Sequence, residues 1–148
     1  MKSWSKKKPA IIRNPNSIRP WQHVLEPLSG YLSLAINLSQ NKELNGKSFN
    51  FGPSDNFNHQ VLEVVKEISI YWPKAKWEIS ENKSIKKEAK LLKLNCDKAT
   101  SLLKWNPTLD FETTMKLTSE WYFNFYKKDE HWDIINASNK QIEFFLEK

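Results

Sequence analysis

Residues 18–27 read IRPWQHVLEP and mark the point where an extended region gives way to a helix. Upstream, residues 9–13 (PAIIR) are typical of a short strand, and residues 14–17 (NPNS) are typical of a turn. We expect residues 18–24 to return as a strand or extended segment, which would make a hairpin-like unit. From residue 27 onward, apolar residues recur at helical spacing and predict an amphipathic helix.

The remainder of the chain predicts further helices joined by short strands. Strands are expected over 48–51 and 77–80, and helices over 58–71, from Asn95 through Leu103, from Asp110 to Tyr126, and over 134–146. The side-chain oxygens of Asn95 and Asp110 can accept unpaired amide protons in the first turns of their helices. We expect an α+β fold whose core includes one aromatic-rich stripe. Its residues are Phe111, Met115, Thr118, Trp121, Tyr122 and Phe125.

Length and composition indicate one soluble domain. The chain has 148 residues, of which 39% are hydrophobic, enough for a single core. No stretch approaches the roughly 18 to 20 apolar residues of a membrane span, and residues 1–10 lack the apolar centre of a signal peptide. We therefore expect a cytoplasmic protein that makes no membrane contact, with a single domain over 1–148.

The side chains that most often bind metals or form disulfides are few. Cys96 is the only cysteine, so no disulfide can form within the chain. The histidines, His23, His59 and His131, are too scattered in sequence to suggest a metal site. We expect no structural metal.

Positive charge is concentrated in two segments. The net charge is +6, and residues 1–30 and 74–104 each carry +5. This distribution suits an anionic ligand or nucleic acid, and a solvated lysine surface would produce the same pattern. Lysine outnumbers arginine 21 to 2, and both arginines, Arg13 and Arg19, lie in the opening segment. A guanidinium binds phosphate bidentately, which favours an anion site here, although chance clustering or pairing with Glu26 would also explain the two arginines.

The residue patterns of several catalytic sites are absent from the sequence. With three glycines, Gly30, Gly46 and Gly52, the chain cannot form a glycine-rich dinucleotide or phosphate loop. No tyrosine is followed four residues later by lysine, and no serine or cysteine lies in a recognisable nucleophile motif. We therefore assign no catalytic residue and interpret the chain as a binding surface.

Four blocks of sequence, in order, resemble the CDP-glucose 4,6-dehydratase family of extended short-chain dehydrogenase/reductases, within the NAD-dependent epimerase/dehydratases. They are IIRNPNSIRPWQHVLEPLSGYLSLA, FNFGP, LLKLNCDKATSLLKWNP and a closing T-x-x-W-Y, and they fall between residues 9 and 126. Residues 127–148 would form a C-terminal helical tail. The string RPWQHVLEPLSGYL is far more specific than the general motif of the superfamily.

The resemblance implies a two-part lyase of deoxysugar and lipopolysaccharide O-antigen biosynthesis. An N-terminal Rossmann domain would hold NAD, and a smaller C-terminal domain would close over a CDP-sugar, with the full-length enzyme a homo-oligomer. NAD would take a hydride from C4 of CDP-glucose, water would leave across C5 and C6, and the hydride would return to C6. This chain would be the substrate-binding C-terminal domain, without the Rossmann domain or a cofactor of its own, and we expect it to be inactive alone.

Four residues are carried over from the family as substrate-binding candidates. Arg19 matches the arginine that grips the pyrophosphate. Ile12 falls where relatives run a strand past the base and ribose, although packing would equally explain an apolar strand residue. Gln22 would orient Arg19 or face the core. Glu88 matches a glutamate that accepts ribose hydroxyl hydrogen bonds, and a solvated glutamate is the competing reading.

Other motif residues are expected to support the site. His23 and Trp21 are assigned structural roles. In the wider superfamily an aspartate is common at the position of Pro20. A proline there fits the dehydratase subgroup. Lys86 and Lys87 stand where relatives often place an arginine or histidine, which puts a second phosphate clamp in doubt.

Three alternatives remain open. The chain could belong to another nucleotide-sugar dehydratase or epimerase, which nucleotide preference would reveal. It could be a basic nucleic-acid-binding module, as residues 6–8 and seven tryptophans suggest, although the tryptophans do not alternate with the lysines. It could also be a structural remnant without nucleotide affinity.

Overall fold

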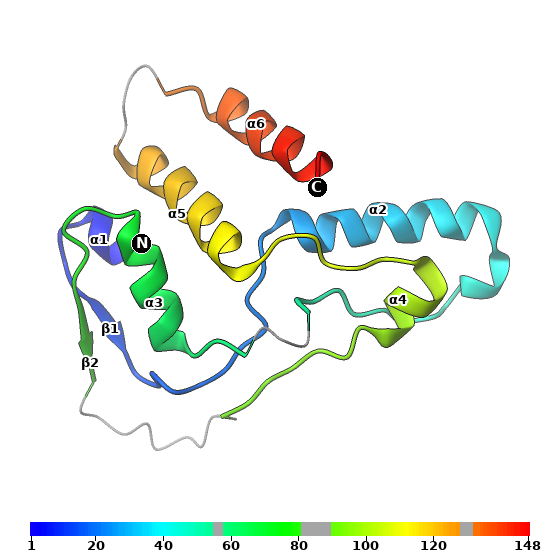
Figure 1. Ribbon diagram of the computed structural model, residues 1–148, viewed down its shortest axis with the longest axis horizontal. Coiled ribbons are helices and arrows are strands. Elements are labelled where there is room, and N and C mark those ends of the chain that lie inside the picture. The colour runs from blue at the N-terminus through cyan, green and yellow to red at the C-terminus, as the bar shows by residue number, and fades with distance from the viewer. Residues whose placement is uncertain (55–57, 81–89, 128–131) are drawn as a thin grey trace.

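The computed structural model describes residues 1–54, 58–80, 90–127 and 132–148, and these form a helical protein with one small sheet (Figure 1). The elements in chain order are α1 (Lys2–Ser5), β1 (Ala10–Ile12), α2 (Leu25–Gln40), the 3-10 helix η1 (Lys42–Leu44), α3 (Val61–Ile70), β2 (Trp77–Ile79), α4 (Asp97–Leu103), α5 (Phe111–Lys127) and α6 (Ile134–Leu146). The expected mixture of helices and short strands is confirmed. Within the described ranges, no helix is both long and apolar enough to span a bilayer.

The hairpin expected at the start of the chain is wrong. β1 pairs in parallel with β2, with Ala10 opposite Trp77, and these two strands form the sheet. Ile18 makes isolated bridges to Gln60 and Leu91 instead of turning back onto β1. The parallel partner places Trp77 against the cluster that buries Ile12, so long-range packing decides the pairing.

The strand expected over 48–51 is also absent. No neighbouring strand lies beside it in the described chain, and its contacts are made by side chains. Gln22 Nε2 donates to the Phe51 carbonyl oxygen at 3.0 Å, and Asn50 Nδ2 donates to the Asn95 carbonyl oxygen at 3.1 Å. A strand requires a partner ladder, so β-type residues alone do not make one.

Side-chain hydrogen bonds mark the start of several helices. Asn95 Oδ1 accepts the Asp97 amide at 3.1 Å, and Asp110 Oδ1 accepts the Thr113 amide at 2.7 Å, as predicted. The backbone amide of Gln60 donates to Glu63 Oε2 at 2.6 Å at the start of α3.

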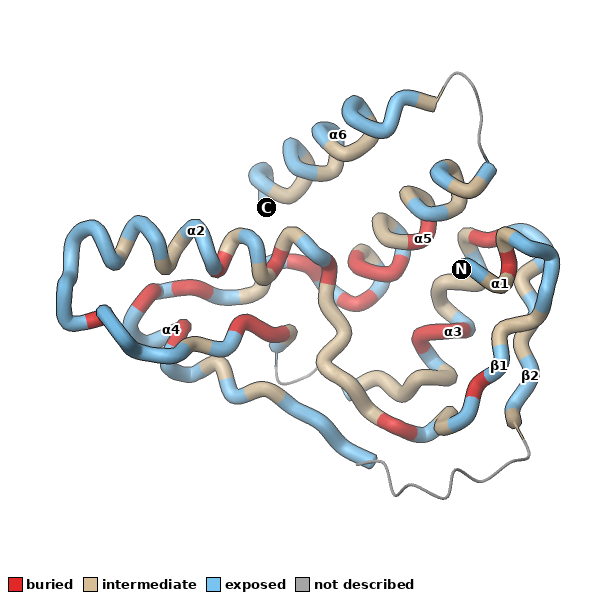
Figure 2. Tube along the Cα trace, turned by 180° about the vertical axis from the view of Figure 1, so that it is seen from behind, coloured by how far each residue is buried: buried red, intermediate tan, exposed pale blue. Residues whose placement is uncertain are grey.

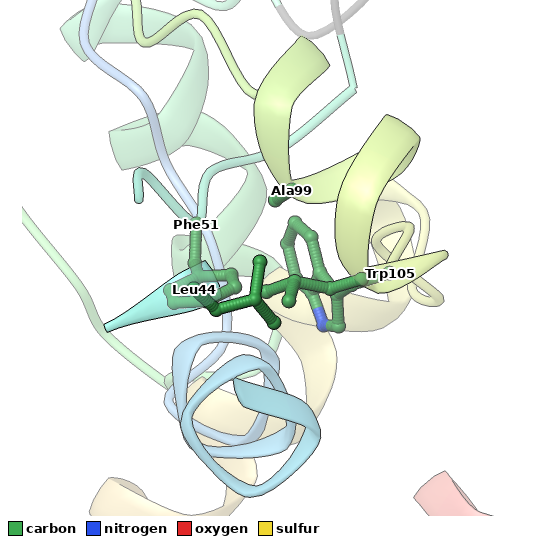
Figure 3. Close-up of a cluster of buried hydrophobic side chains, with 5 residues drawn as sticks. Leu44, Phe51, Ala99 and Trp105 are labelled. Carbon is green, nitrogen blue, oxygen red and sulfur yellow. The ribbon is translucent and has the colours of Figure 1, made fainter. Parts of the chain in front are cut away.

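Among the described residues, three apolar clusters hold together the elements other than α6. One contains Leu44, Phe51, Ala99, Leu103 and Trp105, with Leu34 of α2 packed against it, and four of the five are labelled in Figure 3. A second contains Trp4, Ile12, Val65 and Trp72, and a third contains Val64, Phe111 and Met115. The predicted core stripe of α5 is therefore buried at its beginning only, because Tyr122 and Phe125 are 40% and 42% exposed.

The outer face of α2 is apolar and exposed. Figure 2 shows this helix largely in the exposed colour over its length. The large apolar side chains that face solvent on it and at its N-cap are Val24, Leu28, Tyr31, Leu32, Ile36 and Leu38. We refer to these six residues as the α2 apolar face.

Candidate functional site

The arginine motif lies where three segments of the chain are hydrogen-bonded together. The Ile18 amide donates to the Lys90 carbonyl oxygen at 2.9 Å, and the Leu92 amide donates to the Ile18 carbonyl oxygen at 3.2 Å. The amide of Val61 donates to the Ser17 carbonyl oxygen at 2.9 Å. This junction fixes the backbone on the N-terminal side of Arg19, so its side chain projects from a defined position.

The two arginines differ in their surroundings. Arg19 is half-buried, and its Nη1 donates to the Ile18 carbonyl oxygen at 2.8 Å. Arg13 follows β1 and is exposed. Neither forms an ion pair with Glu26 among the described residues, because that carboxylate accepts backbone amides instead. Pairing with Glu26 therefore does not explain why the arginines are present.

Gln22 ties the motif to the segment 48–53. Its Nε2 donates to Phe51, as described above, while its Oε1 is buried and has no hydrogen-bond partner among the described residues. An unpaired buried acceptor costs about 1–3 kcal/mol. The amide therefore has a structural role at one end, and its predicted contact with substrate remains a prediction.

Trp21 and His23 are supports, as expected. Trp21 Nε1 donates to the His59 carbonyl oxygen at 3.2 Å, and the His59 ring stacks on Phe111 at 3.6 Å. His23 is 4% exposed, and its Nδ1 accepts the Leu25 amide at 3.4 Å. Burial lowers the pKa of His23, and a hydrogen bond with the Gln141 side chain opposes that shift. Burial thus favours the neutral imidazole.

The remaining predicted site residues are not gathered around Arg19 by the structure. Ile12 is buried against Trp4, Val65 and Trp72, which accounts for its apolar character, and its contact with a ligand stays a prediction. Glu88, with Lys86 and Lys87, lies outside the described residues.

Glu26 is a buried residue whose role the sequence did not reveal. It is 1% exposed, and its Oε1 accepts the Leu109 amide at 2.7 Å and the Thr108 amide at 3.0 Å. Burial raises the pKa of Glu26, and the hydrogen bonds from the two amides oppose the rise. The sequence indicated it only as a possible ion-pair partner of the two arginines. The structure shows that it joins the start of α2 to the approach to α5.

Three of the recognised sequence blocks meet beside the motif. A Cβ atom on Gly30 would lie 2.3 Å from Phe51 Cδ1, so this helix position admits only glycine unless Phe51 moves. The Phe51 ring meets Trp105 edge to face, with ring centroids 5.0 Å apart. Trp105 Nε1 donates to Ser29 Oγ at 2.9 Å. Residues of these three blocks thus build and contact the cluster between α2 and α4 that Figure 3 shows.

A cavity of about 440 Å³ opens between the beginning of α2, α5 and α6. It is lined by Gln22, His23, Val24, Leu25, Thr118, Trp121, Tyr122, Ser138, Gln141 and Ile142. The lining is neutral and mostly apolar, so it offers no charge for a phosphate. No group of three potential metal ligands occurs among the described residues.

Comparison with known proteins confirms the resemblance read from the sequence. No protein-family model matches the chain. The chain is 33% identical over 147 residues to the C-terminal part of CDP-glucose 4,6-dehydratase from Salmonella typhimurium strain LT2, covering 99% of this chain and 40% of that protein. It therefore spans 40% of the length of this curated relative.

A solved structure shares the fold. The crystal structure of UDP-glucuronic acid 4-epimerase from Bacillus cereus, in complex with UDP-glucuronic acid and NAD, matches with a TM-score of 0.61 and 18% identity. The match covers 86% of this chain and 38% of the epimerase. At this identity the likeness establishes the fold alone.

Proposed function

We propose that this chain is the nucleotide-sugar-binding portion of an enzyme of the CDP-glucose 4,6-dehydratase type, which converts CDP-glucose to CDP-4-dehydro-6-deoxyglucose and water. The observation that carries the proposal is the 33% identity to such an enzyme across 99% of the chain. The fold shared with a nucleotide-sugar epimerase supports the same ligand class.

In this proposal Arg19 binds the pyrophosphate of the CDP-sugar. Its guanidinium is a planar fork that can donate two parallel hydrogen bonds to phosphate oxygens and keeps its charge when partly buried. The junction of Ser17 and Ile18 with residues 60–62 and 90–92 holds the arginine backbone in place. A preorganised side chain loses less entropy on binding, which favours affinity.

The residues of this chain do not fit NAD, so the redox chemistry is assigned to the rest of the parent enzyme. The space above Gly30 is filled by Phe51, and a Cβ on Gly52 would lie 3.0 Å from Leu94 Cδ1. Gly46 stands alone in an open turn. None of these glycines can cradle a dinucleotide phosphate. Binding and orientation of the sugar nucleotide are the functions left to this chain, which alone would be inactive.

The α2 apolar face and the segment 48–51 are proposed to pack against the Rossmann portion of the parent. Large exposed apolar side chains grouped on one helix face mark an interaction surface. The segment 48–51 has the residue types of a strand but no partner strand in the described chain. A sheet in the remaining portion would supply the missing ladder.

Isothermal titration calorimetry with CDP and with CDP-glucose tests the role of Arg19. Binding should weaken by about tenfold or more in Arg19→Ala, the loss expected for a charge-assisted hydrogen bond. Arg13→Ala is the matched control, because Arg13 is the other arginine and is exposed. Arg19→Lys should recover little, because lysine lacks the fork. Equal affinities in wild type and Arg19→Ala would refute the pyrophosphate role.

Nucleotide preference separates the proposed parent from its relatives. The same titration with UDP and GDP should give weaker binding than CDP. Tighter binding of either would assign the chain to another nucleotide-sugar dehydratase or epimerase. No binding of any nucleotide by the folded chain would favour the structural remnant.

A further inference from the structure

A second, strongly basic cleft lies at the end of the molecule where β1 begins, away from the arginine motif. It has a volume of about 460 Å³, a size typical of small-molecule sites. Its lining comes from α1, from the turn between α3 and β2, and from the end of α5, which Figure 1 shows at one end of the molecule. The residues are Trp4, Ser5, Lys7, Lys8, Trp72, Pro73, Lys74, Lys76, Phe123, Tyr126 and Lys127.

The described residues that line the cleft carry charge of a single sign. Among them are lysines at 7, 8, 74, 76 and 127 and no carboxylate. Within the ranges that the structure describes, no ion pair involves the first four of these lysines. Several ammonium groups brought together from separated segments attract a multiply charged anion more strongly than a monoanion.

The floor of the cleft is aromatic and held in place. Trp4 Nε1 donates to the Lys76 carbonyl oxygen at 2.6 Å, and the same oxygen accepts the Ala10 amide at 2.9 Å. The Trp72 ring lies 5.8 Å from Trp4 and 5.4 Å from Phe123, centroid to centroid. The walls that carry the lysines are thus fixed to the sheet and to α5.

Two of the lysines occupy turn positions that favour glycine. Lys7 and Lys74 have φ values of +56° and +63°, in the left-handed region. Glycine would adopt this backbone conformation with less strain than lysine. At both positions the chain nevertheless has a lysine, and both lysines line the cleft.

We propose that this cleft binds an oligophosphate, a small molecule that carries two or more linked phosphoryl groups. Lysine binds phosphate oxygens as a mobile point charge, and a group of five lysines suits a ligand that carries several negative charges close together. The site is independent of Arg19 and of the nucleotide-sugar function proposed above.

Amide chemical shifts of the full chain, followed in ¹H–¹⁵N NMR spectra during titration with tripolyphosphate, test the proposal. Shifts should concentrate at residues 4–8 and 72–76 and persist in Arg19→Ala. The double variant Lys8→Gln/Lys76→Gln should weaken binding by about tenfold or more, because charge-assisted hydrogen bonds are lost. Both side chains are exposed, so the variant should fold, which the dispersion of its spectrum verifies.

The control is Lys42→Gln/Lys47→Gln, which removes the same charge from exposed positions outside the cleft. It should leave the dissociation constant within about twofold, since surface charges more than a Debye length away are screened. Equal weakening by both double variants, or shifts spread over all lysine-rich surfaces, would overturn the proposal. Shifts confined to the region of Arg19 would also overturn it. If a single-stranded oligonucleotide bound at the same lysines more tightly than tripolyphosphate, the ligand would be a nucleic acid and the proposal of a small molecule would be wrong.

Discussion

The Glu26 carboxylate offers the sharpest test of how the motif shapes the fold. Replacing Glu26 by alanine removes the acceptor of the Leu109 and Thr108 amides. Leu109 is buried, so its amide cannot turn to water, whereas Thr108 is exposed and can recover part of the loss. An unsatisfied buried donor costs about 1–3 kcal/mol, and a cavity adds to this, so we expect Glu26→Ala to lower the free energy of unfolding by about 2–5 kcal/mol.

Glu26→Gln separates the hydrogen bonds from the charge. Glutamine keeps one carbonyl oxygen, which can take the place of Oε1 and accept both amides, and it avoids burying a negative charge. It gives up only the second acceptor of the exposed Thr108 amide, Oε2 at 3.1 Å. Its cost should therefore be less than half that of alanine. Burial raises the pKa of Glu26, so the folded chain binds more protons than the unfolded chain in that pH range. The contribution of Glu26 to stability should consequently fall as pH rises through the raised pKa, and this fall should vanish in Glu26→Gln.

Urea unfolding followed by tryptophan fluorescence measures these differences. Trp105 lies next to Ser29 in the affected cluster, so this cluster contributes to the summed emission of the seven tryptophans. A free energy of unfolding for Glu26→Ala within about 0.5 kcal/mol of wild type, the range of ordinary surface substitutions, would refute the role of this clamp. Equal losses for alanine and glutamine would refute the importance of the retained acceptor.

Further predictions concern His23, Gly30 and the α2 apolar face. Because burial lowers the pKa of His23, urea melts should show stability lost as pH falls below about 6.5, a loss absent in His23→Gln and retained in His59→Gln. Gly30→Ala should cost about 1–3 kcal/mol by overpacking against Phe51, and less when combined with Phe51→Leu than the sum of the two single costs; strict additivity would contradict the clash. Leu32→Lys should change stability by less than about 0.5 kcal/mol and reduce self-association in light scattering; a larger destabilisation would show that this face is packed within the chain.

Features set by neighbouring residues were the ones that could be predicted from sequence. Asp110 caps α5 as expected, and Asn95, one residue before the N-cap Cys96, accepts the first amide of α4, because such bonds join residues within three positions of each other. The last helix, Ile134–Leu146, has its predicted bounds. The resemblance to dehydratases rested on strings of adjacent residues, and it too is confirmed.

Features set by distant partners were missed. The choice of β2 over residues 18–24 as the partner of β1 depends on a tryptophan cluster assembled from α1, α3 and α5. Residues 48–51 have the residue types of a strand but lack a neighbouring strand. The cleft lysines at 7, 8, 74, 76 and 127 lie far apart in sequence, so charge counting identified two basic segments without placing them together. Glu26 was missed for the same reason, since its partners are 82 and 83 residues away.

The bonds that anchor α2 also dictate an order of folding. Trp105 bonds to Ser29 across 76 residues, and the amides of Thr108 and Leu109 reach Glu26 across still longer loops. Closing such loops is slow compared with forming a helix, so α2 can wind early but docks late. A chain that ends before Trp105 lacks the partners of Ser29 and Glu26, although Phe51 can already pack against Gly30. Residues 105–109 must therefore be synthesised before the cluster around α2 and α4 can be completed.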